Sequence, residues 1–399
     1  MSNPRGMRQV VPTILAAVMN LITAQFLSAS TADFREGVNT LGFNLCELLD
    51  PGAQRDLLLS PASIEFALGM AYTGASAETA TAMSRALGLD AVSREEGLTQ
   101  LADLQSALSS PGTGVTLKLA NAGWVDQSVH LNSSFTDELA REFHTAVRSI
   151  NFSDPSTITE INRWVSDATE GKISRLLEKP PPPPLFLANA IYFHAQWNSP
   201  FDKKLTRQQP FHPAHGPSID VSMMRTAGTF PYATGKDFAV VALPYRDKRF
   251  AMYCFLPKGS LAALIQELKK TAWTEVTASL RPSDGSVALP KFKLEYGAPL
   301  KEALVKLGLG IAFDRNRADF SRMTDEPQGF YISDVLHKAY LEIDEEGSTA
   351  AAVTGIQIRA TAIFSPKESF NLVFDHPFLV AITDTKTGVV LFLGIIAEP

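Results

Sequence analysis

The order in which helix and strand patterns occur along the chain most strongly constrains its fold. Apolar residues at helical spacing come first, and apolar strand-like segments dominate the second half. Helices that precede strands predict an α+β architecture with large sheets and argue against alternating βαβ units. Residues 60–72 are apolar nearly all round, which predicts a helix buried deep in the core. The expected helices are residues 34–48, 60–72, 76–89, 161–169 and 299–309, and the expected strands are residues 185–193, 237–245, 249–257, 286–296, 330–344, 370–384 and 388–396, of which the last two form a hairpin.

Residues 345–366, with the sequence EEGSTAAAVTGIQIRATAIFSP, form the most unusual segment. No ionisable side chain occurs between Glu346 and Arg359, and alternate positions from Ser348 to Ala360 are small or apolar. A strand sends alternate side chains to opposite faces, so this pattern predicts a strand with one face that can be buried. Left exposed, such a segment would be prone to aggregation. It is therefore either an ordinary strand of a sheet or a spare strand.

The charge and the cysteine count argue against several classes of function. A net charge of −6 and a pI near 5.7, without a cluster of Lys and Arg, argue against a nucleic-acid partner. Cys46 and Cys254 are the only cysteines and lie in apolar stretches, so we expect buried free thiols and no disulfide framework. His212 and His215 have a spacing that could bind a metal, but Pro213 and the lack of a nearby acidic or Cys ligand argue against it. We expect no metal and no cofactor.

The first residues resemble a secretory signal peptide. Arg5 and Arg8 precede an apolar stretch over residues 10–27, and residues 28–30, which are all small, follow it. We expect residues 1–30 to act as this signal and the mature protein to be secreted. The alternative is that the segment is not cleaved and anchors the protein in a membrane.

The sequence lacks the common motifs of hydrolases and of phosphate-binding enzymes. It contains no Gly-x-Ser-x-Gly, no His-Glu-x-x-His and no phosphate-binding loop that ends in Gly-Lys-Ser/Thr. Ser60, Ser63 and His337 are the candidates for a nucleophile and a base. The two serines open a very apolar helix, however, and His337 starts an apolar strand face that runs to Ile343. We therefore interpret His337 as a hydrogen-bonded core residue and expect no enzymatic activity.

Six segments of the chain resemble motifs of the serpin family, and they occur in the same order as in that family. They are LLSPASIEFALGMAYTGA, INRWVSDATEGKISRLL, LANAIYFHAQWNSPF, LPKFKLEY, LHKAYLEIDEEGSTAAA and FDHPFLVAITDTKTGVVLFLGIIAEP. The resemblance covers essentially all of residues 31–399 and implies a single serpin domain. It implies an α+β fold with three β-sheets, about eight to nine helices and an exposed reactive-centre loop at about residues 345–370.

The resemblance also implies a function, because inhibitory serpins are suicide-substrate inhibitors of serine proteases. The target protease cleaves the reactive-centre loop, which then inserts as an extra central strand into the largest sheet while the protease is still acylated. A non-inhibitory carrier or chaperone is the alternative, and the run of small residues after the first glutamates favours the inhibitor. The implied hinge of the loop is Glu345, Glu346, Gly347, Ser348, Thr349, Ala350, Ala351 and Ala352. The implied shutter, which must part for insertion, is Ser60, Ser63, Asn189 and His337, and Trp197 lies at the implied breach, where insertion starts.

The resemblance places the reactive bond by counting along the loop. Inhibitory serpins usually have the scissile residue at position seventeen from the first hinge glutamate, Glu345, which gives the bond between Thr361 and Ala362. A small residue at that position suits elastase-like or subtilisin-like proteases. The alternatives are Arg359, which would suit a trypsin-like target, and Ile363 or Phe364, which would suit a chymotrypsin-like target.

The resemblance sets the remaining expectations about partners. The segment that binds polyanions in some serpins corresponds to residues 89–108, which hold one Arg and four acidic residues. We therefore expect no activation by heparin. The expected partner is a target serine protease, bound as a covalent acyl complex, and we expect the protein to be a monomer.

Overall fold

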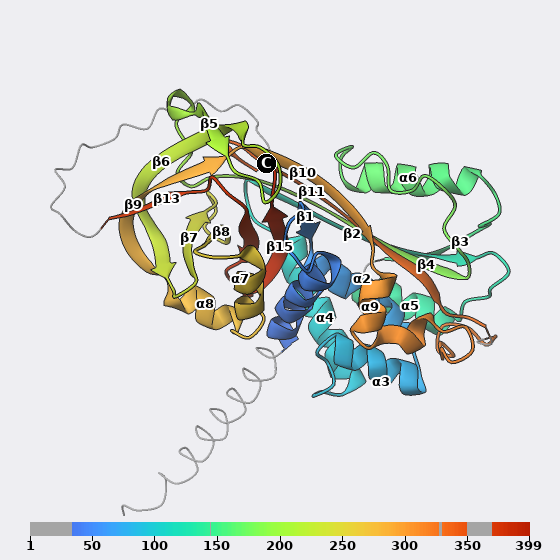
Figure 1. The fold of residues 1–399 in the computed structure, drawn as a ribbon. Coiled ribbons are helices and arrows are strands. Elements are labelled where there is room, and N and C mark those ends of the chain that lie inside the picture. Colours follow the sequence, from blue (N-terminus) through green and yellow to red (C-terminus); the bar gives the residue numbers. More distant parts are fainter. Residues whose placement is uncertain (1–33, 144, 327–328, 349–368) are drawn as a thin grey trace, which may run out of the picture.

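The computed structural model describes residues 34–143, 145–326, 329–348 and 369–399, which form two hydrogen-bonded sheets with helices packed around them (Figure 1). The first helix covers residues 34–49. The other helices are α2 (Pro61–Gly74), α3 (Ala77–Ala86), α4 (Arg94–Ser109), α5 (Ser133–Phe143), α6 (Ser156–Ala168), α7 (Leu261–Leu268), α8 (Trp273–Ser279) and α9 (Lys301–Lys306).

The strands of the described residues separate into a six-stranded and a nine-stranded sheet. The six-stranded sheet has the order β10 (Phe292–Pro299), β11 (Ile332–Ile343), β12 (Gly347–Ser348), β4 (Leu185–Gln196), β2 (Val115–Asp126) and β3 (Val147–Ile150). The nine-stranded sheet has the order β1 (Leu57–Leu59), β15 (Val389–Ile396), β14 (Phe378–Asp384), β8 (Phe250–Pro257), β7 (Phe238–Pro244), β6 (Ile219–Thr234), β9 (Arg281–Pro290) and β13 (Phe370–Val373), and β5 (Arg207–Phe211) pairs with β6.

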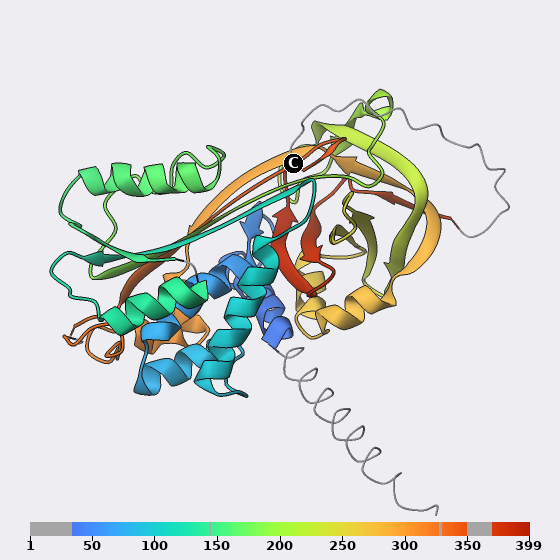
Figure 2. The same cartoon turned by 180° about the vertical axis from the view of Figure 1, so that it is seen from behind.

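Helices cover both faces of the six-stranded sheet. The helix α6 lies over one face, and α2, α4 and α5 lie under the other (Figures 1 and 2). Because successive side chains of a strand point to opposite faces, a strand between two helical layers must be apolar on both sides. β4 meets this requirement, since it is buried along almost its whole length. The α6 layer has its own apolar cluster, which includes Trp124, Ile161 and Tyr192.

The helix α2 forms the centre of the main core, as its sequence predicts. All fourteen of its residues are buried. Its start is defined by Ser60, whose hydroxyl oxygen accepts a hydrogen bond from the Ser63 backbone N–H, and by Pro61 in the first turn. The expectation of a deeply buried helix over residues 60–72 is therefore confirmed. The face of α2 that carries Ser60 and Ser63 meets the six-stranded sheet.

The α+β fold class is confirmed, with nine α-helices among the described residues, but these residues contain two hydrogen-bonded sheets and not three. The reason is β6, which pairs with β9 over Met223–Tyr232 and then with β7 over Tyr232–Thr234. This long strand joins two groups of strands that would otherwise be separate sheets. As a consequence, the sheet that carries the hinge is not the sheet with the most strands.

Several strand predictions need correction. Residues 286–296 were expected to form one strand, but they contribute to β9 and β10, which lie in different sheets. The chain passes from one sheet to the other at Lys291, directly after Pro290. β2 and β6 were not predicted, although β2 is a twelve-residue strand next to β4. The hairpin of β14 and β15 is confirmed, but the expected strand 370–384 is two strands, because β13 pairs with β9 and only β14 pairs with β15.

The two cysteines are buried free thiols, as expected. Burial raises the pKa of both Cys46 and Cys254 far above the ordinary value of a thiol, so neither is a reactive thiolate. His212 and His215 have separate partners, because His212 Nδ1 lies 2.8 Å from Ser218 Oγ and His215 Nε2 lies 2.8 Å from Gln54 Oε1.

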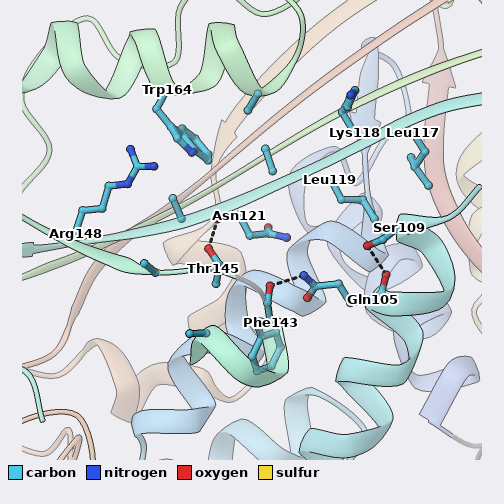
Figure 3. A pocket seen from close by; sticks show the side chains of 15 residues that line it. Gln105, Ser109, Leu117, Lys118, Leu119, Asn121, Phe143, Thr145, Arg148 and Trp164 are labelled. Carbon is cyan, nitrogen blue, oxygen red and sulfur yellow. Dashed lines mark hydrogen bonds between the residues drawn. The ribbon is translucent and has the colours of Figure 1, made fainter. Parts of the chain in front are cut away.

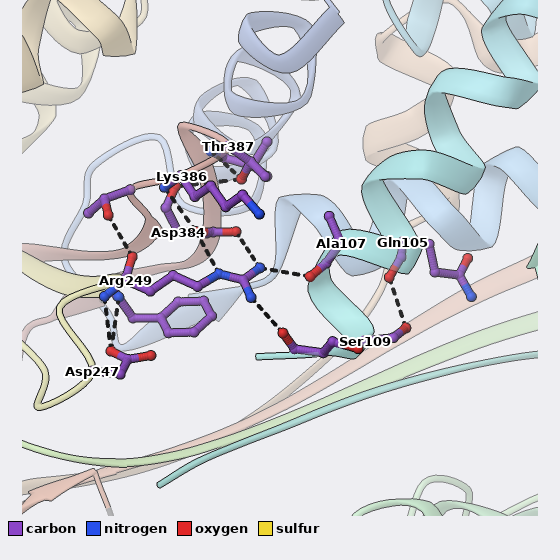
Figure 4. A network of polar contacts seen from close by, with 12 residues as sticks. Gln105, Ala107, Ser109, Asp247, Arg249, Asp384, Lys386 and Thr387 are labelled. Carbon is purple, nitrogen blue, oxygen red and sulfur yellow. Dashed lines mark hydrogen bonds and ion pairs between the residues drawn. The ribbon is translucent and has the colours of Figure 1, made fainter. Parts of the chain in front are cut away.

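A buried ion pair connects α4 to the nine-stranded sheet (Figure 4). Arg249 binds both carboxylate oxygens of Asp384, at 3.1 and 2.8 Å, and the Asp384 side chain is fully buried. The same guanidinium group donates to the carbonyl oxygens of Ala107 (2.7 Å) and Ser110 (2.6 Å) at the end of α4. These bonds satisfy carbonyl groups that have no partner within the helix. Arg249 therefore fixes the end of α4 against the β14–β15 hairpin.

Replacing Arg249 by Leu should lower the free energy of unfolding by about 3 kcal/mol, because Asp384 would remain as an unpaired buried charge. The double variant Arg249→Leu/Asp384→Leu should lose less, since both charges are then removed. Denaturant unfolding of the two variants and of the parent protein measures these differences. A double variant that is less stable than the single variant would contradict this account of the pair.

Candidate functional site

The centre of the six-stranded sheet is a parallel contact between β4 and β11. The two strands pair directly from Ile332 opposite Leu185 to Tyr340 opposite Tyr192. Beyond this point they separate, and β12 lies between them. Ser348 of β12 pairs antiparallel with both neighbours, opposite Ile343 of β11 and Ala195 of β4. We call the direct β4–β11 contact the seam; the chain at residues 347–348 has already entered its upper end.

Backbone hydrogen bonds hold the chain in place before it enters the seam. The Trp197 backbone N–H donates to Glu346 O and the Phe201 N–H donates to Glu345 O, both at 2.9 Å. The indole N–H of Trp197 donates to Asp344 O at 2.9 Å. The ring of Trp197 also stacks on Tyr245, with a centroid distance of 4.6 Å. Trp197 therefore lies at the point where β12 begins.

The close approach of the backbone explains why position 347 is a glycine. The φ angle of Gly347 is 153°, and a Cβ atom there would lie 2.0 Å from the carbonyl oxygen of Ala195. No side chain fits at that distance. The next residue, Ser348, is fully buried, and its hydroxyl group lies 2.7 Å from the hydroxyl oxygen of Tyr245. Only a small side chain can occupy the position of Ser348 without displacing Tyr245.

Both hinge glutamates are held by cations of the neighbouring strands and loops. Glu345 is 3% exposed; Lys291 Nζ lies 2.6 Å from its Oε2 atom, and Thr206 donates to Oε1 at 2.7 Å. Burial alone would raise the pKa of Glu345, but the hydrogen bonds from Lys291 and Thr206 outweigh it, so the pKa lies below its ordinary value. Glu346 pairs with Lys203 at 2.5 Å, which raises the pKa of Lys203. Glu345 therefore anchors the hinge as a carboxylate at neutral pH, and Glu346 anchors it through its contact with Lys203.

A buried polar row crosses the seam beneath the hinge. His337 of β11, Asn189 of β4 and Asn121 of β2 occupy the same register on adjacent strands. His337 Nδ1 lies 2.5 Å from Asn189 Oδ1, and its Nε2 atom accepts from the Ser60 N–H at 3.3 Å. Ser63 donates to Asn121 Oδ1 at 3.5 Å. These residues link the seam to the first turn of α2.

The imidazole of His337 is neutral at physiological pH. Burial lowers its pKa to about 3, although the carbonyl oxygen of Leu58, 3.3 Å from Nε2, opposes this shift because it favours the protonated ring. The hydroxyl oxygen of Ser60 accepts from the Ser63 N–H instead of facing the imidazole, and all three side chains are fully buried. This geometry does not match a nucleophile and its base, which need a direct hydrogen bond and access for a substrate.

The comparisons with known proteins agree with this geometry. Residues 36–399 match the family model described as serpin (serine protease inhibitor). The chain belongs to the serpin family. It is 34% identical over 394 residues to Iripin-8 of Ixodes ricinus, covering 96% of this chain and 97% of the relative. It is 33% identical over 360 residues to the leukocyte elastase inhibitor of Equus caballus, covering 86% and 93%.

Solved serpin structures have the same fold. The native state of the thermophilic serpin tengpin superposes with a TM-score of 0.83 at 27% identity, covering 100% of this chain and 97% of tengpin. Human thyroxine-binding globulin superposes with a TM-score of 0.84 at 27% identity, covering 92% and 99%. Thyroxine-binding globulin was solved in complex with thyroxine, so the fold alone does not separate an inhibitor from a carrier.

Some of the residues expected for the serpin hinge, breach and shutter form two clusters in the structure, and the others lie outside the described residues. The structure brings together Glu345, Glu346, Gly347 and Ser348 with Trp197, and it brings together Ser60, Ser63, Asn189 and His337. The other hinge residues and the reactive-bond candidates lie outside the described residues: Thr349, Ala350, Ala351, Ala352, Arg359, Thr361, Ala362, Ile363 and Phe364. The expected signal peptide, residues 1–30, also lies outside them. Among the described residues, no helix has the length and apolarity needed to cross a membrane.

Sequence reasoning missed several residues of this serpin site. Most of them contact a predicted residue that lies far away along the chain, so no local pattern marks them. Asp344 is the exception and had a local signal, because an Asp before Glu-Glu-Gly can accept from backbone N–H groups two and three residues on, and it does so. The missed residues are Asn121, Lys203, Thr206, Tyr245, Lys291 and Asp344.

The stability of this serpin should depend on the protonation of His337. Its folded pKa of about 3 lies below the ordinary 6.5, so the unfolded chain binds more protons between these values. The contribution of neutral His337 to the free energy of unfolding is fully present above pH 6.5. It is lost as the pH falls, by up to about 1.4 kcal/mol per pH unit. Thermal unfolding between pH 5 and 7.5 should show a smaller loss of stability at low pH in the variant His337→Gln than in the parent protein.

The parent protein must be compared with the variant His337→Gln, because Glu65 also titrates and changes the stability in the opposite sense. Both carboxylate oxygens of Glu65 are buried without a partner among the described residues, and burial raises its pKa well above the ordinary value. Its contribution therefore falls as the pH rises, in both proteins alike. Equal slopes in the parent and in the variant His337→Gln would contradict the role of His337.

Proposed function

We propose that this serpin is an irreversible suicide-substrate inhibitor of serine proteases. The observation that carries the proposal is the position of Ser348, which pairs antiparallel with both strands of the seam. The residues that follow Ser348 need only continue in the same direction to enter the seam as a full strand. In this mechanism the protease serine attacks the carbonyl carbon of the reactive bond, the peptide C–N bond breaks, and an acyl–enzyme ester forms.

Insertion of the loop then separates the protease from its starting position. Residues 347–361, extended at about 3.3 Å per residue, span roughly 50 Å. The acylated protease is carried along with the inserted strand, and deacylation fails because its active site is distorted. The inserted strand also exchanges the β4–β11 parallel pairing for two antiparallel pairings, which supplies the driving force.

The sequence of the loop selects the target class. We assign the reactive bond to Thr361 and Ala362, which favours elastase-like or subtilisin-like proteases, and Arg359 remains the alternative for a trypsin-like target. We assign secretion to residues 1–30 and a monomeric state to the free inhibitor. We expect no heparin activation, because the one Arg of α4, Arg94, donates its N–H groups to the carbonyl oxygens of Tyr72 and Thr73.

The first test mixes the protein with elastase-, subtilisin-, trypsin- and chymotrypsin-type proteases and separates the products on denaturing gels. Trapping gives a band at the summed mass that survives boiling, whereas clean cleavage without this band supports the carrier function.

Ser348→Glu should convert trapping into cleavage and reduce the trapped fraction by about tenfold or more, because a charge cannot enter the buried position between β4 and β11. Ser348→Ala, the matched small substitution, should still trap.

The second test compares the intact protein with the protein cut once in its loop. Filling the seam replaces one row of backbone hydrogen bonds with two, so the midpoint of thermal unfolding of the cut form should rise by at least about 10 °C. The cut form of Ser348→Glu should show little of this rise. A cut parent protein that unfolds at the same temperature as the intact one would contradict loop insertion, whatever the gels show.

A further inference from the structure

The strand β2 has an open edge above β3. On one side it pairs with β4 from Val115 to Val125, but on the other side β3 pairs only with residues 123–126. The odd-numbered residues of β2 point their backbone groups to this open side, since Asn121 O accepts from Thr145 and Gln127 N–H donates to Ile150 O. The N–H and C=O groups of the next odd positions, Leu117 and Leu119, therefore face no strand among the described residues.

A cavity of about 830 Å³ lies along this open edge (Figure 3). Its lining includes side chains from both faces of β2. This is expected at the edge of a sheet, where an additional strand would have neighbours on both faces. Leu117 and Leu119 line it on the side of α4 and α5, together with Phe143. Lys118 lines it on the side of α6, together with Arg148 of β3 and Trp164. One wall therefore combines apolar side chains with a few uncharged polar ones, and the other wall is cationic.

The charge of the lining differs from that of the whole protein. Among the described residues the lining contains two cations and no carboxylate, although the net charge of the chain is −6. Lys118 pairs with Glu170 at 3.0 Å, but both side chains are about half exposed, so this pair is weak and a ligand can compete for it. Arg148 has no ion pair within the described part of the chain. The cavity is thus electrostatically suited to an acidic ligand.

The cavity also contains an unused hydrogen-bond acceptor. Gln105 of α4 donates its side-chain N–H to Phe143 O at 2.7 Å, but its Oε1 atom is buried and has no partner among the described residues. A buried polar atom without a partner costs about 1–3 kcal/mol, which a ligand that donates a hydrogen bond would recover.

We propose that the open edge of β2 binds an extended peptide in which apolar and acidic residues alternate. The peptide lies beside β2 as an added strand and pairs with the free backbone groups of Leu117 and Leu119. Alternate side chains then point to opposite faces. The apolar ones enter the wall formed with Phe143, and the acidic ones reach Lys118 and Arg148. This binding is independent of protease trapping.

Fluorescence anisotropy with a labelled peptide of about eight residues, in which Val and Glu alternate, tests the proposal. The protein should bind this peptide at least about tenfold more tightly than the same peptide with Lys in place of Glu. A third peptide, with Val and Glu alternating but with every second backbone amide N-methylated, should not bind, because it cannot pair as a strand. Equal binding of the acidic and the basic peptide, or no loss on N-methylation, would overturn the proposal.

Charge-reversed variants locate the bound peptide on the protein. The double variant Lys118→Glu/Arg148→Glu should lose the Glu peptide and gain the Lys peptide. Lys236→Glu is the matched control, since Lys236 is exposed near the turn between β6 and β7 and the change should not affect binding. A Glu peptide that binds the double variant and the parent equally well would show that it enters another site, such as the seam, and would refute the assignment to β2. The gels that test protease trapping do not depend on this result, so either proposal can fail without the other.

Discussion

The parallel pairing of β4 with β11 is the constraint on which the rest of the structure depends. Parallel pairs are slightly less stable per residue than antiparallel pairs. From Leu185 to Tyr192 of β4 no strand lies between β4 and β11, so the two pair directly. Both are buried between helical layers, so the seam cannot open without exposing apolar side chains on two faces. At its upper end Gly347 and Ser348 already show the alternative, in which a third strand pairs antiparallel with both. The closed seam is thus one of two arrangements that the same strands can adopt.

Buried polar groups in and near the seam make the closed arrangement less stable than a fully apolar core would be. Asn189 accepts from His337, but its own amide N–H₂ group has no partner among the described residues. Glu65, in α2, has two buried carboxylate oxygens without a partner there. Each such group costs about 1–3 kcal/mol, a large fraction of the net stability of a folded protein. A core without these groups would hold the seam more firmly and would leave less free energy to be released by insertion.

Sequence reasoning predicted the helices and strands in which all side chains of one face meet the same kind of surroundings. α2 is apolar all round because every side of it meets protein, and the face of β11 from His337 to Ile343 is buried as a simple alternation predicts. β2 was missed because its two faces meet different layers, so polar residues such as Lys118 and Asn121 interrupt the apolar pattern. The merging of two sheets through β6 and the contacts of Tyr245 depend on pairings between distant segments, which no local pattern contains.

In the two proposals made above, the six-stranded sheet accepts a strand at two different places, and the number of neighbouring strands at each place separates their roles. A strand in the seam bonds to β4 and β11 together and is covered on both faces, so its insertion is strongly favoured and is not readily reversed. A strand at the edge of β2 bonds to one neighbour only and keeps its other edge in water, so it gains about half as many backbone hydrogen bonds and can dissociate. The seam has to be opened by breaking the contact between His337 and Asn189, whereas the edge of β2 is already open. The same sheet can thus combine one slow, irreversible insertion with one fast, reversible binding event, because the first must overcome a closed contact and the second need not.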